Sequence, residues 1–435
     1  MKVASTRSPY NVVSFREALF EGLASDGGLY VPVENYDLRN LYLSLDPKKN
    51  YSELAAQMLI PLFNDEIPQD QINKICQDAF FFSPQLKKLD ENFYILELFH
   101  GPSCAFKDFG ASFLATAMSW FLQNENKRSI ILTATSGDTG SAVAHAFYQK
   151  PNIDVVILYP SGRVSPLQEK QLTTLGHNIH ALEVKGSFDD CQRLVKEAFL
   201  DNQLADLPLT SANSINLGRL IPQSLYYIWS FVQLRDSLND DLIFTVPSGN
   251  FGNLTAGVYA WKWGLPVFKF IAATNINDVV PEYLKTQRFR PRPSLATYSN
   301  AMDVGNPSNF ERLEVLFQKN PNLMGALISA ESVTDHQTLE TIKKIWTEHH
   351  YDICPHTAVG VKASLDYQNL FSEDGSCHVV LATAHPAKFV EVVQMATGRE
   401  PKLPEQLQKL SQKQKQSLLI EAELDSLKEF LGSLR

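Results

Sequence analysis

The sequence contains no hydrophobic run long enough to cross a bilayer. None of its apolar stretches approaches the roughly 18 to 20 residues that a membrane-spanning helix needs. Residues 1–15 also lack the charged start, apolar stretch and cleavage site of a secretory signal peptide. We therefore expect no membrane partner and a cytoplasmic location.

Cysteine is scarce and scattered. The five cysteines are odd in number and none belongs to a C-x-x-C pair, which argues against a disulfide framework and a thiolate zinc site. The ten histidines form no H-E-x-x-H sequence, the commonest zinc-hydrolase signature. We expect no metal.

An excess of positive charge is missing as well. The 39 basic and 48 acidic side chains give a net charge of -9, and no stretch concentrates Lys and Arg. The phosphate-driven electrostatics of nucleic-acid binding therefore have no source, and we expect no nucleic-acid partner. The sequence also lacks a G-x-G-x-x-G and a P-loop, the usual fingerprints of NAD and ATP sites.

From residue 91 onward, short apolar runs bounded by Gly, Ser, Asn and Pro alternate with longer amphipathic runs. This alternation predicts parallel sheets covered by helices on both faces. The expected strands are 93–98, 130–134, 153–159, 179–184, 242–246, 267–272 and 378–382. The expected helices are 108–122, 139–149, 166–175, 188–200 and 252–263. Ligands of such folds bind where the strands end, so we look for chemistry in the loops that follow the strands.

The first ninety residues have a different pattern, with helices expected at 15–23, 52–63 and 69–80. The chain of 435 residues also exceeds what one hydrophobic core supports, roughly 250 to 300 residues. We therefore predict an α/β protein with two doubly wound domains, each built on a mainly parallel sheet, and a mostly helical N-terminal unit. The expected boundaries are 1–90 for that unit, 91–215 for a small α/β domain and 216–435 for a large α/β domain with C-terminal helices. The tail from Leu403 is expected to be helical.

The loop 100–110 joins a strand to a helix and carries a lysine between two phenylalanines. Lys107 lies near the helix start, where the macrodipole and the apolar neighbours Phe106 and Phe109 disfavour an ammonium ion. A lysine tuned in this way loses its proton more easily, as a Schiff-base nucleophile requires. The alternative is a surface lysine that pairs with Asp108.

Two further loops between strands and helices could hold an anion. Residues 133–141 (T-A-T-S-G-D-T-G-S) open a helix with backbone N–H groups and hydroxyls, and residues 247–253 (P-S-G-N-F-G-N) combine two glycines with two asparagines. The alternatives are a helix capped by Asp138 or Thr139 and a tight turn without a ligand. Residues 213–219 (N-S-I-N-L-G-R) add a guanidinium suited to bidentate anion binding, or are an Asn-rich loop with one surface arginine. Thr357, at the start of another predicted helix, is adequately explained as a cap.

Together, an activated lysine and several anion sites at strand ends indicate an enzyme that holds a phosphorylated cofactor by its aldehyde and its phosphate. The sequence resembles the threonine synthase family of pyridoxal-phosphate enzymes, which have the tryptophan-synthase-beta-like fold (fold type II), in its long bacterial and fungal form. The resemblance covers nearly the whole chain. It rests on the lysine and glycine loops together with S-T-R at 5–7, S-F-R-E-A-L at 14–19, G-L-A-S-D-G-G-L-Y-V-P at 22–32 and A-T-A-H-P-A-K-F at 382–389.

The resemblance implies a role for each of these loops. Lys107 would bind pyridoxal 5'-phosphate as a Schiff base and then shuttle protons, and Thr357 would face the pyridine nitrogen of the cofactor. The cofactor phosphate would be held by Gly249, Asn250, Phe251, Gly252 and Asn253. The implied substrate is O-phospho-L-homoserine, converted with water to L-threonine and inorganic phosphate by a monomer or homodimer. The residues implied for its carboxylate and phosphate are Ser136, Thr139, Asn213, Ser214 and Arg219.

One departure from the fold type is Asp138, a position where related members commonly have Asn. We therefore do not assign to Asp138 a hydrogen bond to the 3-hydroxyl of the cofactor. A second is Ser103, where the family more often has Thr. Two alternatives share the cofactor: another fold type II enzyme, such as a serine or threonine dehydratase or a sulfhydrylase, and a non-catalytic cofactor-binding protein. A third is phosphatase-like hydrolysis without a cofactor.

Overall fold

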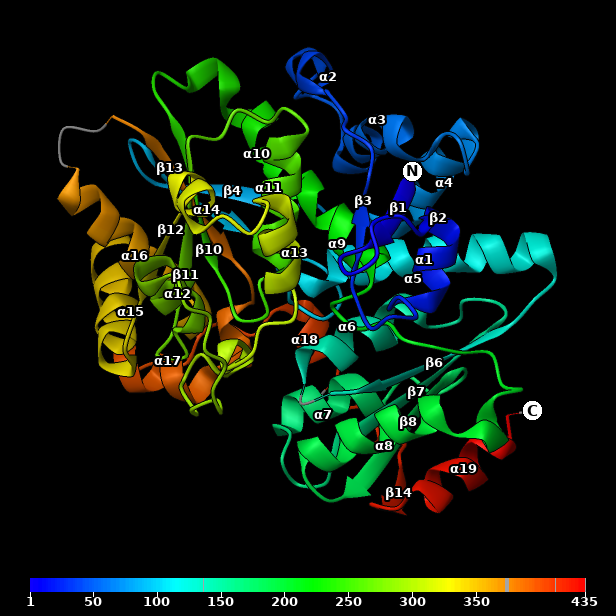
Figure 1. Ribbon diagram of the computed structural model, residues 1–435. Coiled ribbons are helices and arrows are strands. Elements are labelled where there is room, and N and C mark those ends of the chain that lie inside the picture. The colour runs from blue at the N-terminus through cyan, green and yellow to red at the C-terminus, as the bar shows by residue number, and fades with distance from the viewer. Residues whose placement is uncertain (136, 372–374, 411, 435) are drawn as a thin grey trace.

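The computed structural model describes residues 1–135, 137–371, 375–410 and 412–434. These residues form two lobes, each built on a mainly parallel sheet, and an N-terminal unit (Figure 1). The predicted α/β class with two mainly parallel sheets is confirmed. No helix in the described ranges is long and apolar enough to cross a membrane.

The larger sheet has the strand order β12-β11-β10-β13-β5-β4. All neighbours are parallel except the hairpin of β4 and β5. Its strands are β4 (Gln85–Asp90), β5 (Phe93–Glu97), β10 (Leu242–Pro247), β11 (Lys269–Thr274), β12 (Ile328–Ser332) and β13 (Cys377–Ala382). The central strands β10 and β13 are buried along their whole length, because helices cover both faces of the sheet.

The smaller sheet is parallel throughout, in the order β14-β8-β7-β6-β9. Its strands are β6 (Ser129–Ala134), β7 (Ile153–Pro160), β8 (Ile179–Lys185), β9 (Leu209–Thr210) and β14 (Leu418–Glu421). A third, antiparallel sheet in the N-terminal unit joins β1 (Lys2–Ser5), β2 (Val12–Ser14) and β3 (Tyr30–Pro32). The N-terminal unit is therefore not only helical.

The α-helices begin after polar caps in several places. Ser14 and Glu17, Ser187 and Asp190, and Thr334 and Gln337 form reciprocal capping boxes. The helices are α1 (Phe15–Glu21), α2 (Arg39–Ser44), α3 (Tyr51–Phe63), α4 (Gln69–Ala79), α5 (Lys107–Glu125), α6 (Asp138–Phe147), α7 (Pro166–Thr173), α8 (Phe188–Leu200), α9 (Leu217–Leu220), α10 (Ser224–Leu234), α11 (Gly252–Lys262), α12 (Val279–Thr286), α13 (Phe310–Leu316), α14 (Pro321–Leu327), α15 (Asp335–His349), α16 (Pro355–Leu370), α17 (Val390–Thr397), α18 (Glu405–Gln408) and α19 (Leu424–Gly432). The 3-10 turns are η1 (Asn202–Leu204), η2 (Ile221–Gln223), η3 (Arg235–Ser237), η4 (Asn300–Met302) and η5 (Pro386–Lys388).

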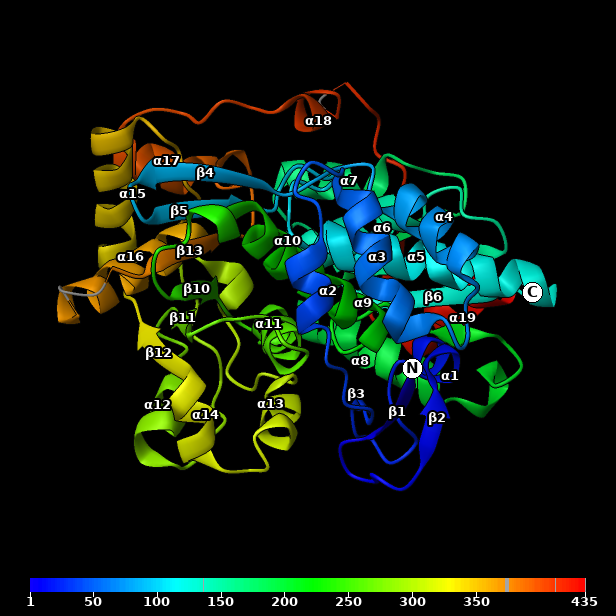
Figure 2. The same ribbon diagram turned by 90° about the horizontal axis from the view of Figure 1, so that it is seen from above.

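The prediction of a helical tail from Leu403 is wrong in part. The chain leaves α17 in the larger lobe, crosses the molecule through the short α18 and reaches the smaller lobe (Figure 2). There residues 418–421 form β14, which pairs with β8, and α19 packs on α8. Pairing explains the strand, because β8 would otherwise leave an open sheet edge.

The two main sheets exchange strands across the predicted domain boundaries. β5, within 91–215, lies between β13 and β4 of the larger sheet, and β14, within 216–435, lies in the smaller sheet. The boundaries themselves stay predictions. The exchange places the loop after β5, which carries Lys107, between the two lobes.

Candidate active site

Lys107 is the first residue of α5, directly after the loop that follows β5. Neighbouring segments fix this loop: the Phe106 N–H donates to the Thr383 carbonyl at 2.8 Å, and Ala105 forms an isolated antiparallel bridge with Ala384. Asp108 does not pair with Lys107, because its carboxylate accepts the Ser103 N–H at 2.9 Å. The backbone around Lys107 is therefore held in place, while the Lys107 amine has no hydrogen-bond partner among the described residues.

Charge and burial both act on the Lys107 amine. Burial lowers its pKa, and the nearby cations Arg219 and Lys388 lower it further, against the opposing effect of the Asp138 carboxylate. A lower pKa means a larger share of neutral, nucleophilic amine near neutral pH. This is the property that the sequence predicted for Lys107.

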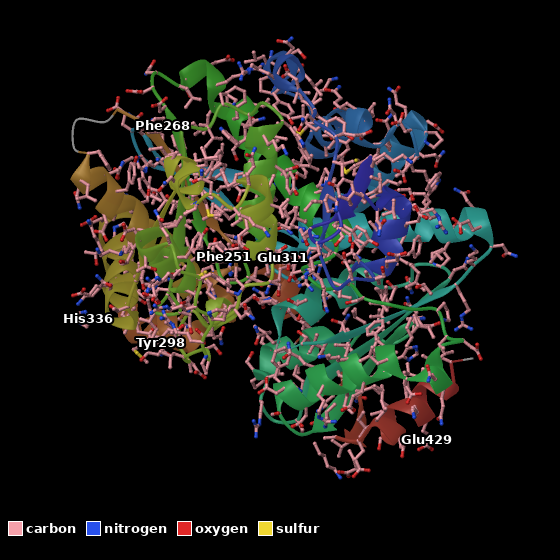
Figure 3. All side chains as sticks on the ribbon, viewed as in Figure 1. Phe251, Phe268, Tyr298, Glu311, His336 and Glu429 are labelled. Carbon is pink, nitrogen blue, oxygen red and sulfur yellow. The ribbon has the colours of Figure 1, made fainter. Side chains whose placement is uncertain are left out.

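The loop 249–253 provides a row of free donors at the start of α11. None of its five main-chain N–H groups has a hydrogen-bond partner among the described residues. The loop is tightly supported: Phe251 is buried in a left-handed conformation, and a Cβ on Gly249 would lie 2.7 Å from Met302 Cα. Figure 3 labels Phe251 near the middle of the view, whereas His336 and Glu429 are labelled at its edges. Free N–H groups at a helix N-terminus are the expected site for a phosphate, so the loop fits that group.

The two asparagines of this loop use their side chains to shape it. Asn253 Nδ2 donates to the Pro247 carbonyl at 2.8 Å, and its Oδ1 accepts the Leu254 N–H at 2.9 Å. Asn250 Nδ2 donates to Ser214 Oγ at 2.8 Å, and its Oδ1 accepts the Ser308 N–H. Each amide nitrogen uses one of its two N–H groups in these contacts, whereas the five main-chain N–H groups are all free for a phosphate.

Asn309 lies against the same loop and was missed by the sequence analysis. A Cβ on Gly252 would lie 3.2 Å from Asn309 Nδ2, a fully buried donor without a partner in the described chain. Its Oδ1 accepts from the buried Arg312 at 2.6 Å, which fixes the orientation of the amide. An unpaired buried donor beside a row of free N–H groups extends the anion site. No local sequence pattern marks Asn309.

The loop between β6 and α6 is organised by Thr135. Its Oγ1 accepts the N–H groups of Gly137 and Gly140, so neither Asp138 nor Thr139 caps the helix as predicted. Gly137 has φ 152°, and a Cβ there would lie 2.7 Å from Gln168 Nε2. Thr139 is half-buried in the first helical turn, without a hydrogen-bond partner among the described residues. Ser136, a predicted substrate residue, lies outside the described residues.

The segment 213–219 connects the other two loops. Asn213 Oδ1 accepts from Thr133 Oγ1 at 3.1 Å, at the end of β6, and Ser214 Oγ accepts from Asn250. Arg219 is buried in α9; one of its terminal nitrogens donates to the Ala212 carbonyl at 2.7 Å, while its Nε has no partner in the described chain. Burial lowers the pKa of this guanidinium to about 10, partly opposed by Asp108. Arg219 therefore remains cationic at neutral pH, with a donor left for an anion.

Thr357 lies buried in the first turn of α16, but it is not the cap that the sequence predicted. Cys354 is the N-cap, and its sulfur accepts the Thr357 N–H at 3.4 Å. The Thr357 hydroxyl is 3.2 Å from the same sulfur. Next to it, burial lowers the pKa of His356 to about 4, so this imidazole is neutral at pH 7.

A buried ion pair completes the cluster. Lys388 Nζ is 2.7 Å from Asp138 Oδ1, and both side chains are almost fully buried. Burial alone would raise the pKa of Asp138, but Lys388, Lys107 and a hydrogen bond from Gln168 together hold it well below its usual range. No group of three or more His, Cys, Asp or Glu side chains able to hold a metal occurs within the described ranges.

Comparisons with known proteins cover the whole chain. A family profile described as "Pyridoxal-phosphate dependent enzyme" matches residues 76–383, and profiles described as "Threonine synthase N terminus" and "Threonine synthase, C-terminal" match residues 2–80 and 357–431. Threonine synthase of Haemophilus influenzae is 44% identical over 414 residues, 95% of each chain.

Solved structures of threonine synthases are also similar to this chain. The crystal structure of threonine synthase from Escherichia coli superimposes with a TM-score of 0.90 at 40% identity, covering 100% of both chains. A PLP-bound threonine synthase from Brucella melitensis gives a TM-score of 0.92 at 37% identity, covering 99% of this chain and 98% of that one. Threonine deaminase isoform 2 from Solanum lycopersicum, at 16% identity and a TM-score of 0.58 over 85% of this chain and 98% of that one, shares the fold alone.

Proposed function

The chain belongs to the pyridoxal-phosphate-dependent threonine synthase family, and from this premise we propose that it converts O-phospho-L-homoserine and water to L-threonine and inorganic phosphate. One observation supports this proposal most strongly. A lysine whose pKa is lowered and whose amine lacks a partner lies among the loops that hold the free donors of residues 249–253 and of Arg219. A cofactor with an aldehyde and a phosphate needs the first two features, and a phosphorylated substrate needs the third.

The residues present fit the cofactor. The neutral amine of Lys107 would attach to its aldehyde carbon, and the main-chain N–H groups of 249–253 would bind its phosphate, with Asn309 Nδ2 as a further donor. Thr357 would offer a hydroxyl to the pyridine nitrogen. When bound, the cofactor supplies an electron sink for the carbanions of the reaction.

Lys107 would also move the protons of the reaction. Whenever the Lys107 amine is not attached to the cofactor, it would be a base suited to remove the proton from the α carbon of the substrate, because its pKa is lowered. Burial of the surrounding groups keeps bulk water from competing for that proton.

Substrate recognition would depend on the segment 213–219 and on the start of α6. Arg219 is suited to the substrate phosphate, because its guanidinium is cationic, buried and incompletely hydrogen-bonded. Asn213, Ser214 and Thr139 lie on the loops around it, and we propose that they share the phosphate and carboxylate contacts. Ser136 stays in the proposed set from its sequence position.

The test is to measure threonine and phosphate together from O-phospho-L-homoserine. Lys107→Ala should lower both by at least about a hundredfold, because it removes the nucleophile and the base. Lys127→Ala, just beyond the other end of α5, is the matched control. Phosphate release by Lys107→Ala at the parent rate would show cofactor-independent hydrolysis, and deamination of serine or threonine without threonine formation would show a dehydratase.

We further propose that the protein acts in the cytoplasm as a monomer or a homodimer. Sedimentation equilibrium of the purified chain distinguishes the two assemblies, and subcellular fractionation tests the location. A larger assembly or a membrane-associated fraction would contradict the proposal.

A further inference from the structure

Lys388 and Asp138 form an ion pair between the two lobes. Lys388 ends η5, which follows β13 of the larger sheet, and Asp138 begins α6 of the smaller lobe. Their charged atoms are 2.7 Å apart and both side chains are nearly excluded from solvent. A buried pair of this kind adds little net stability compared with an apolar pair, so stability alone does not explain it.

The same ammonium also contacts the loop that carries Lys107. Lys388 Nζ donates to the Ser103 carbonyl at 2.6 Å, four residues before Lys107. Helix α7 supports both ends of this arrangement: Gln171 Nε2 donates to the Ser103 carbonyl and Gln168 Nε2 to Asp138 Oδ1, each at 3.0 Å. Lys388 is therefore held between Asp138 and the backbone of the lysine loop.

The charges around Lys107 come from several elements. Asp138 on α6 favours its ammonium form, whereas Arg219 on α9 and Lys388 on η5 disfavour it. Asp108, whose pKa is raised to about 6 by burial, and the neutral His356 on α16 complete the set. Within this described set, the Asp138 carboxylate is the one group that directly favours the charged form of Lys107. The cation paired with Asp138 is Lys388.

We propose that Lys388 is a positioning residue for Lys107: by pairing with Asp138 it neutralises that carboxylate, and so leaves the Lys107 amine free to react. This inference deepens the proposed function and rests on it. Without Lys388, the Asp138 charge would act on Lys107 alone and stabilise its ammonium form. Removing the charges of both Lys388 and Asp138 would leave the net charge that acts on Lys107 unchanged.

The experiment follows the capture of pyridoxal phosphate by the full chain stripped of cofactor. The limiting rate of Schiff-base formation at saturating pyridoxal phosphate is read from visible absorbance at several pH values. Lys388→Met should lower this rate about tenfold at pH 7, corresponding to one pKa unit on Lys107, and the deficit should vanish at high pH. Asp138→Asn should not lower it, and the double variant Lys388→Met/Asp138→Asn should recover the parent rate.

Two controls separate this role from a structural one. Lys388→Arg keeps the cation and should retain the parent rate, and Lys428→Met removes a partly buried ion pair with Asp201 elsewhere in the smaller lobe and should change nothing. An unchanged rate in Lys388→Met, or an equal loss in the single and double variants, would overturn the proposal. Failure of the proposed function gives a different result: the parent chain would form no threonine from O-phospho-L-homoserine, whatever the Schiff-base rates of the variants. Recovery in the double variant keeps the test decisive even if Lys388→Met folds poorly.

Discussion

At the scale of single residues, the site is recognised by polar groups that the protein leaves unpaired. Buried donors are normally satisfied, so Arg219 Nε and Asn309 Nδ2 indicate where a ligand completes the structure. Lys107 follows the same logic, since its amine lacks a partner while burial lowers its pKa. Each of these residues keeps one polar group that is free to contact a ligand.

Arg219→Lys should weaken substrate binding although it preserves the charge. Lysine cannot offer the forked donors of a guanidinium, and losing one hydrogen bond to a charged group costs about 1.5 to 3 kcal/mol. We expect KM for O-phospho-L-homoserine to rise about 10- to 100-fold, measured by steady-state phosphate release. Arg193→Lys, on the exposed face of α8, should leave KM unchanged; an equal KM in both variants would remove Arg219 from the substrate site.

At the scale of elements, one loop positions another. The turn of residues 299–303 lies over the phosphate loop, with Met302 Cα and the Ala301 carbonyl placed where a side chain on Gly249 would project. The same turn is tied to α16, because the Ala301 N–H donates to His356 Nε2 at 3.1 Å. The loop after β10, the turn that follows α12 and the start of α16 therefore support one another.

Gly249→Ala should loosen the cofactor. The new Cβ would lie 2.7 Å from Met302 Cα and 3.0 Å from the Ala301 carbonyl, and because both are main-chain atoms no side-chain rotation relieves the contact. We expect the dissociation constant for pyridoxal phosphate to rise about tenfold in an absorbance titration. Gly325→Ala, where an added Cβ meets nothing within 4 Å, is the control; equal affinities would contradict the account.

His356 should make the protein less stable in mild acid. Its folded pKa of about 4 lies below the usual 6.5, so between these values the unfolded chain binds a proton that the folded chain does not. Stability is therefore complete above about pH 6.5 and falls as the pH drops toward 4, by about 3 kcal/mol for this group. Urea unfolding at several pH values should show a flatter dependence in His356→Gln, while the exposed His336→Gln should match the parent chain. A parallel curve for His356→Gln would refute this assignment.

Sequence reasoning succeeded where the candidate functional residues lie together in one short loop of the chain. Lys107 and residues 249–253 directly follow strands with clear apolar patterns, so both loops were found. Lys388 and Asn309 come from distant segments, and the sheet topology alone brings them to the site. The caps were assigned wrongly at α6 and α16, because which hydroxyl or thiol accepts the first N–H groups depends on loop conformation, as Thr135 and Cys354 show.

At the scale of the whole molecule, the C-terminal segment joins the two lobes. It crosses from α17 through α18 to β14 and α19, adding an edge strand and a covering helix to the smaller lobe (Figures 1 and 2). Ile420, Leu427 and Leu431 enter a core shared with β6, β7, β8 and α8. The integrity of the smaller lobe, which carries Asp138, thus depends on residues at the far end of the chain.

Leu427→Ala should destabilise the protein by about 2 to 5 kcal/mol, because Leu427 is fully buried and its loss leaves a cavity. Leu418→Ala, on β14, is a matched control with a half-exposed side chain, and we expect it to cost less than about 1 kcal/mol. Denaturant unfolding of both variants measures the difference. Equal losses would show that the tail does not share the core of this lobe.

The most direct test of the account is reduction of the cofactor-loaded enzyme with borohydride, followed by peptide mapping. We predict a single labelled lysine per chain, in the peptide that contains Lys107. A label on Lys388 or any other lysine, or no label after incubation with pyridoxal phosphate, would contradict the assignment of Lys107 as the residue that binds the cofactor.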